Sequence, residues 1–270
     1  MSFDRALAAG SGSLSKSRKA ARSARHWLAF ALTLAIATLA GPTGARADMY
    51  VIESTVPNML VGARLAETET LTIPAGAYVR VVLPSGKTQN IRGPYSGKVS
   101  DLTKGVESNE NLMELVRKLL QTGGSKETVA GASRSAGIAA GAPRGFSLMA
   151  IPTWVDGKVC VLSGAKIVLA RQSTENAERA VLVNAKSFER AQVEWEAGSA
   201  TAAWPVNLAL RADATYQVLV QDREGRDVTV HFMDKAPDED DILIVLHKHG
   251  CTHQLGAWAR DRMLAGKDKS

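Results

Sequence analysis

The chain has 270 residues, with 33 Lys and Arg against 27 Asp and Glu, and therefore a formal net charge of +6 at pH 7. The first 47 residues hold seven basic residues and one acidic residue, so the remaining 223 residues carry 26 of each sign and no net charge. Because a nucleic-acid-binding protein needs a basic surface against the phosphates, this balance excludes nucleic acid as an expected partner of residues 48–270.

The first 47 residues have the composition of a secretory signal peptide. A basic segment of 26 residues precedes an uncharged apolar run of 14 residues at 27–40, and Ala45-Arg46-Ala47 supplies small residues at both key positions of a cleavage site. At about 1.5 Å per residue the run spans roughly 21 Å, which is short of a hydrocarbon core of about 30 Å. We expect cleavage after Ala47 and a periplasmic or secreted protein. The alternative is an uncleaved leader that anchors the protein in the inner membrane through residues 27–40. We expect contact with the membrane only in that case.

Residues 48–121 are expected to form a small β module with a helix at its end. Between residues 50 and 93, short segments of alternating apolar residues are separated by turn residues, which predicts a small antiparallel sheet or barrel. Apolar residues then recur with helical spacing and predict an amphipathic helix at 109–121. Its expected N-cap is Ser108 or Asn109, because both side chains can accept a hydrogen bond from the first helical turn.

The stretch from residue 61 to residue 94 resembles the FecR-like periplasmic β domain. The resemblance rests on a start at Val61-Gly62, on Ala75-Gly76-Ala77 before an alternating strand, and on Ser85-Gly86 in the turn after it. FecR-type proteins sense occupied outer-membrane transporters and act on a cytoplasmic sigma factor. The 26 residues before the apolar run are too few for the cytoplasmic domain of that family, so the resemblance implies the exported β module alone.

Residues 122–145 consist mainly of Gly, Ala and Ser and contain no aromatic residue, so we predict a flexible linker. In residues 146–270 short strand patterns follow one another with regular turn signals, which predicts an antiparallel sandwich closed by a terminal helix at about 252–264. The expected elements include a hairpin through Asp156-Gly157, a strand at 207–211 and a last strand at 241–246. The predicted fold class is mainly β, with two β-rich modules.

The second module resembles an immunoglobulin- or fibronectin-type β sandwich. Leu210 precedes Tyr216 by six positions, and Val218 and Val220 follow in alternation. This spacing resembles the tyrosine corner of such sandwiches, in which the tyrosine hydroxyl bonds to nearby backbone.

Two cysteines, Cys160 and Cys251, are the only ones in the chain. An even number in an exported protein predicts a disulfide, which would tie the terminal helix to the sandwich across 91 positions. The alternative is a free Cys251 thiol whose pKa is lowered by the helix N-terminus and the histidines beside it, and which serves as the nucleophile of a cysteine-dependent enzyme. We predict the disulfide, because an exported protein rarely keeps a free thiol.

Three of the five histidines lie close together, at His247, His249 and His253. If the preceding strand continued through them, His247 and His249 would share one face and could bind zinc or copper, with Cys251 or His253 as a third ligand and His231 as a further one. The alternative is histidines without a ligand at a strand end. We expect no cofactor, and zinc or copper is the alternative.

No catalytic residue is predicted, because the sequence lacks the motifs G-x-S-x-G, C-x-x-C and H-E-x-x-H and a phosphate-binding glycine loop. Trp154 and Trp195 are expected in the core, whereas Trp204 in a loop or edge position is the candidate for a binding surface. The acidic run at 238–241 is expected to be a solvated loop before the last strand.

These observations together predict an exported, bacterial-type envelope protein with a non-catalytic interaction or scaffold role, whose partner is an envelope protein or a glycan. The alternative is a metal-binding periplasmic protein that uses the histidine and cysteine cluster at 247–253.

Overall fold

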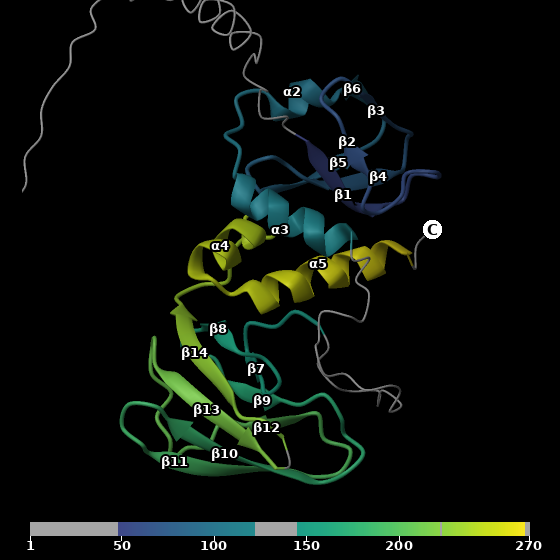
Figure 1. The fold of residues 1–270 in the computed structure, drawn as a ribbon. Coiled ribbons are helices and arrows are strands. Elements are labelled where there is room, and N and C mark those ends of the chain that lie inside the picture. Colours follow the sequence, from purple (N-terminus) through teal and green to yellow (C-terminus); the bar gives the residue numbers. More distant parts are fainter. Residues whose placement is uncertain (1–47, 122–144, 222, 268–270) are drawn as a thin grey trace, which may run out of the picture. The chain divides into compact units, whose positions relative to one another are not determined.

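The computed structural model describes residues 48–121, 145–221 and 223–267, so the expected signal peptide and nearly all of the expected linker lie outside the described residues. Within these ranges fourteen strands form four sheets, accompanied by four helices (Figure 1). This confirms the prediction of a mainly β fold. The described residues belong to one compact unit, and the division into two modules stays a prediction.

The first six strands form two antiparallel sheets. A four-stranded sheet has the order β2-β1-β4-β5, and β3 pairs with β6. The alternation seen in the sequence places apolar side chains on the buried face, as in β3, where Leu71 and Ile73 are buried and Thr70 and Thr72 are exposed. The bounds are β1 Met49–Ser54, β2 Arg64–Leu65, β3 Thr70–Ile73, β4 Tyr78–Val82, β5 Thr88–Arg92 and β6 Tyr95–Lys98.

Two helices follow these strands, α2 (Val99–Thr103) and α3 (Glu110–Gln121). The second is the helix predicted at 109–121. Its N-cap is Asn109, whose side-chain oxygen accepts a hydrogen bond from the backbone N–H of Leu112 at 3.1 Å.

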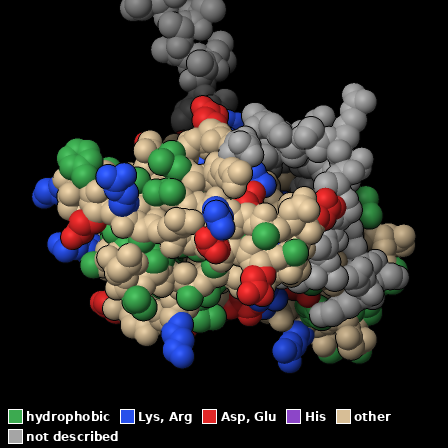
Figure 2. All heavy atoms as spheres, turned by 90° about the horizontal axis from the view of Figure 1, so that it is seen from below, with side chains coloured by type: hydrophobic (Ala, Val, Ile, Leu, Met, Phe, Trp, Pro, Cys, Tyr) green, Lys and Arg blue, Asp and Glu red, His purple; other side chains and the backbone are tan. Residues whose placement is uncertain are grey.

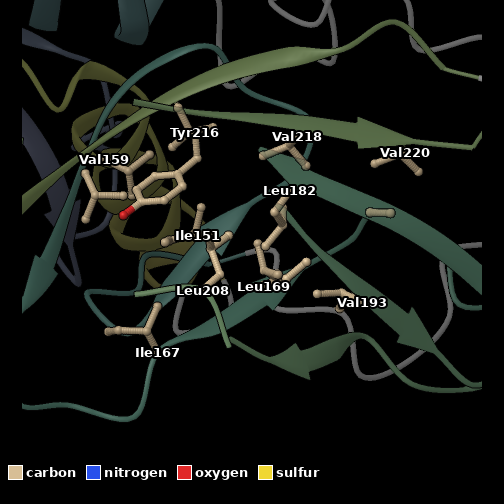
Figure 3. Packing of buried hydrophobic residues seen from close by; sticks show 14 of the residues in the cluster. Ile151, Val159, Ile167, Leu169, Leu182, Val193, Leu208, Tyr216, Val218 and Val220 are labelled. Atoms are coloured by element: carbon tan, nitrogen blue, oxygen red, sulfur yellow. The ribbon is translucent and has the colours of Figure 1, made fainter. Parts of the chain in front are cut away.

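The next eight strands form two sheets, one five-stranded in the order β11-β10-β13-β14-β8 and one three-stranded in the order β12-β9-β7. Buried side chains from both sheets make one core, shown in Figure 3, in which Leu169 and Ile151 from the smaller sheet pack with Leu182 and Val218 from the larger one. The bounds are β7 Ala150–Pro152, β8 Gly157–Leu162, β9 Val168–Ala170, β10 Glu178–Asn184, β11 Arg190–Trp195, β12 Thr201–Ala203, β13 Thr215–Val220 and β14 Arg226–Met233.

The predicted hydroxyl-to-backbone bond of Tyr216 is present. Its hydroxyl donates to the carbonyl oxygen of Ala209 at 2.7 Å and accepts from the backbone N–H of Arg211 at 2.9 Å. The ring is buried beside Val159 and Ile151 (Figure 3), so the hydroxyl fixes the chain before β13 without leaving a buried polar group unpaired.

Three sequence predictions in this half are wrong, and the first two concern strands. Residues 150–162 are not a hairpin, because β7 pairs in parallel with β9 and β8 pairs in parallel with β14. The two sheets are therefore mixed and not purely antiparallel. Residues 207–211 are not a strand, because their backbone groups instead bond Pro205 and the Tyr216 hydroxyl.

The third wrong prediction is the last strand, because residues 242–249 form helix α4 (Ile242–His249). Ile242, Leu243 and Leu246 are its buried residues, which is a helical spacing. A short apolar run fits a buried strand and a buried helix equally well by periodicity, and here the helix is the structure formed. Gly250, with φ of 75°, ends it.

The terminal helix α5 (Thr252–Lys267) begins directly after Cys251, as predicted. Cys251, Leu255 and Trp258 are all buried in one cluster with side chains of β1, β4, α3 and α4. Figure 1 shows α3, α4 and α5 beside one another. The disulfide between Cys160 and Cys251, with Cα atoms 5.8 Å apart, joins this helix to β8, so the predicted pairing is confirmed.

Gln254, on the first turn of α5, covers the outer edge of β8. Its amide oxygen accepts from the backbone N–H of Cys160 at 2.7 Å, and its amide nitrogen donates to the carbonyl oxygens of Cys160 and Ser147, each at 2.7 Å. The side chain is almost fully buried. At Cys160 of β8, Gln254 therefore supplies the hydrogen bonds that a neighbouring strand would otherwise make.

We predict that Gln254→Leu lowers the free energy of unfolding by about 2–4 kcal/mol, because it removes the partner of three backbone groups, of which the N–H and the carbonyl of Cys160 are buried. Urea unfolding followed by circular dichroism measures this change. Gln192→Leu, at an exposed position of β11, is the matched control and should change stability far less. Equal effects of the two substitutions would contradict the role given to Gln254.

We also predict no free thiol when the unfolded, unreduced protein is titrated with a thiol reagent. The disulfide closes a loop across 91 positions, so on the chain-entropy relation its reduction should lower the free energy of unfolding by about 4–5 kcal/mol. Two thiols per chain in the unreduced protein would contradict the disulfide.

Candidate functional site

A polar cleft of about 520 Å³ lies beside the first sheet. Its walls come from β1, β4, β5, the turns at the ends of β4 and β5, the segment before α4, and α5. The lining residues are Glu53, Gly76, Ala77, Tyr78, Arg80, Asn90, Arg92, Gly93, Glu239 and Arg262.

The strand register brings the central side chains of the cleft together. Glu53 on β1 lies opposite Arg80 on β4, which lies opposite Asn90 on β5, and in the next row Tyr78 lies opposite Arg92. Since side chains alternate between faces along a strand, Tyr78 and Arg80 project from the same face. Five polar side chains therefore occupy neighbouring positions on one face of three strands.

Arg80 is a buried charge of the cleft, with 9 % of its side chain exposed, and faces Glu53, which is also buried. Its Nη2 donates to Glu239 Oε2 at 3.1 Å. Its Nε lies 3.9 Å from Glu53 Oε2 and its Nη1 lies 3.6 Å from Asp240 Oδ1. These carboxylates balance the charge, yet among the described residues Nε and Nη1 have no hydrogen-bond partner.

A second buried arginine in the same protein shows how the fold satisfies such a group. The side chain of Arg171 is 2 % exposed. Its Nε, Nη1 and Nη2 donate to three backbone carbonyl oxygens at 2.8, 2.6 and 2.8 Å, those of Ser199, Asn176 and Glu196. Arg171 is thus a structural residue with hydrogen bonds on all three nitrogens, whereas Arg80, which lines the cleft, has two buried nitrogens without a hydrogen-bond partner among the described residues.

The remaining cleft groups are both donors and acceptors. The Tyr78 hydroxyl donates to Glu53 Oε1 at 2.5 Å, and Glu239 also pairs with Arg262 of α5. The side-chain oxygen of Asn90 is buried without a hydrogen-bond partner among the described residues. Arg92 is exposed at the rim. The cleft can therefore hold a ligand through several hydrogen bonds of both directions.

The acidic run at 238–241 has a larger role than the sequence predicted. Its first three residues are exposed, but Glu239 and Asp240 pair with Arg80, and the backbone N–H of Thr88 on β5 donates to the carbonyl oxygen of Asp240 at 2.8 Å. The run precedes helix α4 and not a strand. The sequence does contain one sign of this pairing. Arg80 is a lone charge within an apolar strand, and a buried charge needs partners of opposite sign.

The two cysteines are both in the disulfide and have no exposed surface. A disulfide sulfur does not supply the thiolate that a nucleophilic cysteine requires. The structure therefore gives the Cys251 nucleophile alternative no support.

The histidines predicted as candidate metal ligands lie in different surroundings. His249, on α4, stacks on His231 of β14 with ring centroids 4.3 Å apart. His253, on α5, stands edge-on to Trp154 with centroids 6.2 Å apart. His247 has a buried Nδ1 without a hydrogen-bond partner among the described residues. No group of three or more His, Cys, Asp or Glu in the described part of the chain could hold a metal ion, and zinc or copper binding stays a prediction of the sequence.

Asp213 lies beside the His231 ring of the His231–His249 pair. His231 Nδ1 lies 3.0 Å from Asp213 Oδ1, and this hydrogen bond lowers the pKa of the Asp213 carboxyl. Burial, followed by the charge of His231, lowers the pKa of His249. The pair is therefore a structural contact between α4 and the end of β14.

Trp204, the candidate for a binding surface, is half-buried. Its indole N–H donates to the carbonyl oxygen of Leu208 at 2.7 Å, and its ring meets Tyr216 edge-on at 5.0 Å. Trp195 is in the core as predicted, and Trp154 is partly buried against it. Because Trp204 packs on Tyr216 with its N–H already bonded, the cleft offers more unsatisfied hydrogen-bonding groups than this surface does.

This chain matches no protein-family model, no curated protein and no solved structure. The FecR-like and immunoglobulin-like resemblances stay predictions of the sequence, and the function is argued from the site. None of the helices in the described residues is long and apolar enough to span a membrane.

His253 makes the stability depend on pH. Burial, followed by the charge of Arg260, lowers its pKa from 6.5 to about 4. The folded state therefore favours the neutral ring. The stability that the neutral His253 ring gives the folded state is complete above pH 6.5 and is lost as the pH falls towards 4. At about 1.4 kcal/mol per pKa unit, the loss is at most about 3.5 kcal/mol.

We predict that His253→Gln reduces the loss of stability between pH 6.5 and pH 4. Urea unfolding at several pH values across this window measures the slope for the wild type and the variant. Lys248→Gln, at an exposed position of α4, is the control and should keep the wild-type slope. An unchanged slope in His253→Gln would contradict the assignment.

Proposed function

We propose that the protein is an exported envelope protein with a non-catalytic role, and that it binds an envelope protein or a glycan in the polar cleft. The single observation that carries the proposal is the buried Arg80 side chain, which lines the cleft and whose Nε and Nη1 donors have no hydrogen-bond partner among the described residues. A buried polar group without a partner costs about 1–3 kcal/mol. A ligand that accepts these hydrogen bonds offsets this cost on binding.

The ionisable groups of the cleft support binding over catalysis. Glu53 accepts a hydrogen bond from Tyr78 and faces Arg80, and Glu239 pairs with both Arg80 and Arg262. Carboxylates held in this way orient a ligand, while a general base must be available to accept a proton.

Two further observations agree with an exported protein whose partner is not a nucleic acid. The Cys160–Cys251 disulfide is typical of an oxidising compartment. On the face shown in Figure 2, basic and acidic side chains are interspersed without a broad field of one sign, as expected for a protein that does not bind nucleic acid.

The proposal is tested by binding to a glycan array and to fractionated envelope proteins. Arg92→Gln removes the exposed cleft arginine without disturbing a buried side chain, and Arg117→Gln at an exposed position of α3 is the matched control. We expect a ligand that binds equally well to the wild type and to Arg117→Gln. Arg92→Gln should bind the same ligand at least about tenfold more weakly, a loss of about 1.4 kcal/mol in binding free energy. A ligand that binds Arg92→Gln as it binds the wild type, or that is chemically converted, would contradict the proposal.

A further inference from the structure

We infer that the ligand of the cleft is a neutral saccharide unit, recognised through its hydroxyl groups. The inference rests on the proposed function and narrows its ligand class. Three properties of the cleft carry it: the balance of its charges, its two kinds of unsatisfied group and its volume.

The charges of the cleft are balanced within the protein. Arg80 and Arg262 pair with three carboxylates, those of Glu53, Glu239 and Asp240, of which all but Asp240 line the cleft. A third arginine, Arg92, also lines the cleft and is exposed. An anion beside Arg80 would meet the three carboxylates already around it, and a cation would meet three guanidinium groups. Both charged ligands would therefore disturb existing ion pairs, and a neutral ligand would not.

The unsatisfied groups are of both kinds. Arg80 Nε and Nη1 are donors, and the side-chain oxygen of Asn90 is an acceptor; the register places these two residues opposite each other on β4 and β5. A hydroxyl group donates one hydrogen bond and accepts others, so neighbouring hydroxyls of one sugar ring can satisfy both residues. An apolar ligand would leave both unpaired.

The volume of the cleft limits the size of what it can enclose. About 520 Å³ falls within the range of roughly 300–1,000 Å³ found for sites of small ligands. Such a site encloses a saccharide unit, either free or at the end of a larger glycan. The exposed position of Arg92 at the rim leaves room for the rest of a chain outside.

The test compares neutral sugars with their charged counterparts. Glucose, galactose and mannose, the matching uronic acids and the matching 2-amino sugars are titrated into the full chain at constant ionic strength, and binding is followed by amide chemical shifts in NMR spectra. We expect at least one neutral sugar to bind, at least about tenfold more tightly than its anionic and cationic counterparts.

Asn90→Asp is the decisive variant. The new carboxylate can accept the unpaired hydrogen bonds of Arg80 in place of the ligand, so we expect the affinity for the neutral sugar to fall at least about tenfold. Gln192→Glu, which makes the same type of change at an exposed position of β11, should bind as the wild type does. Equal affinity of Asn90→Asp and the wild type would overturn the inference.

Failure of the inference is distinguishable from failure of the proposed function. Tighter binding of a uronic acid or an amino sugar, or no binding of any sugar while another ligand depends on Arg92, overturns the saccharide inference and leaves the binding function standing. If no ligand of any class depends on Arg92, both are overturned.

Discussion

The disulfide between Cys160 and Cys251 is the constraint on which the arrangement of the last helix depends. It fixes the residue before α5 to β8, and Gln254 then satisfies the backbone of β8 from the first turn of the helix. With its start held in this way, α5 packs in the cluster that contains Tyr50 and Ile52 of β1. The same helix carries Arg262 to the cleft, so the covalent link and the candidate site depend on one element.

The two buried arginines differ in whether the protein satisfies their hydrogen-bond donors. Arg171 has a carbonyl partner for each of its three nitrogens, whereas Arg80 has carboxylates around it and two N–H groups without a hydrogen bond among the described residues. Unsatisfied buried groups are uncommon in folded proteins, and each one needs a physical explanation. A ligand that accepts these hydrogen bonds is the explanation proposed for Arg80, and the account of the cleft as a binding site follows from it.

Much of the fold could be predicted from local patterns in the sequence. Alternation predicted the antiparallel strands of the first sheets, helical spacing predicted α3, cysteine parity predicted the disulfide, and the spacing of Leu210 and Tyr216 predicted the hydroxyl-to-backbone bond. Helix α4 was missed because a short apolar run fits a buried strand as well. The cleft was missed because no local pattern in the sequence contains the features that form it. These are the register of three strands and the approach of Glu239 to Arg80 across 159 positions.

The central claim is that the two unpaired N–H groups of Arg80 are the donors that hold the ligand. The most direct measurement is the NMR signal of the arginine Nε–H groups with and without a saturating neutral sugar, with Arg171 as the internal reference. The account predicts that the Arg80 Nε–H signal shifts and its hydrogen exchange slows, while the Arg171 signal is unchanged. An Arg80 signal that does not respond to a bound sugar would contradict the account.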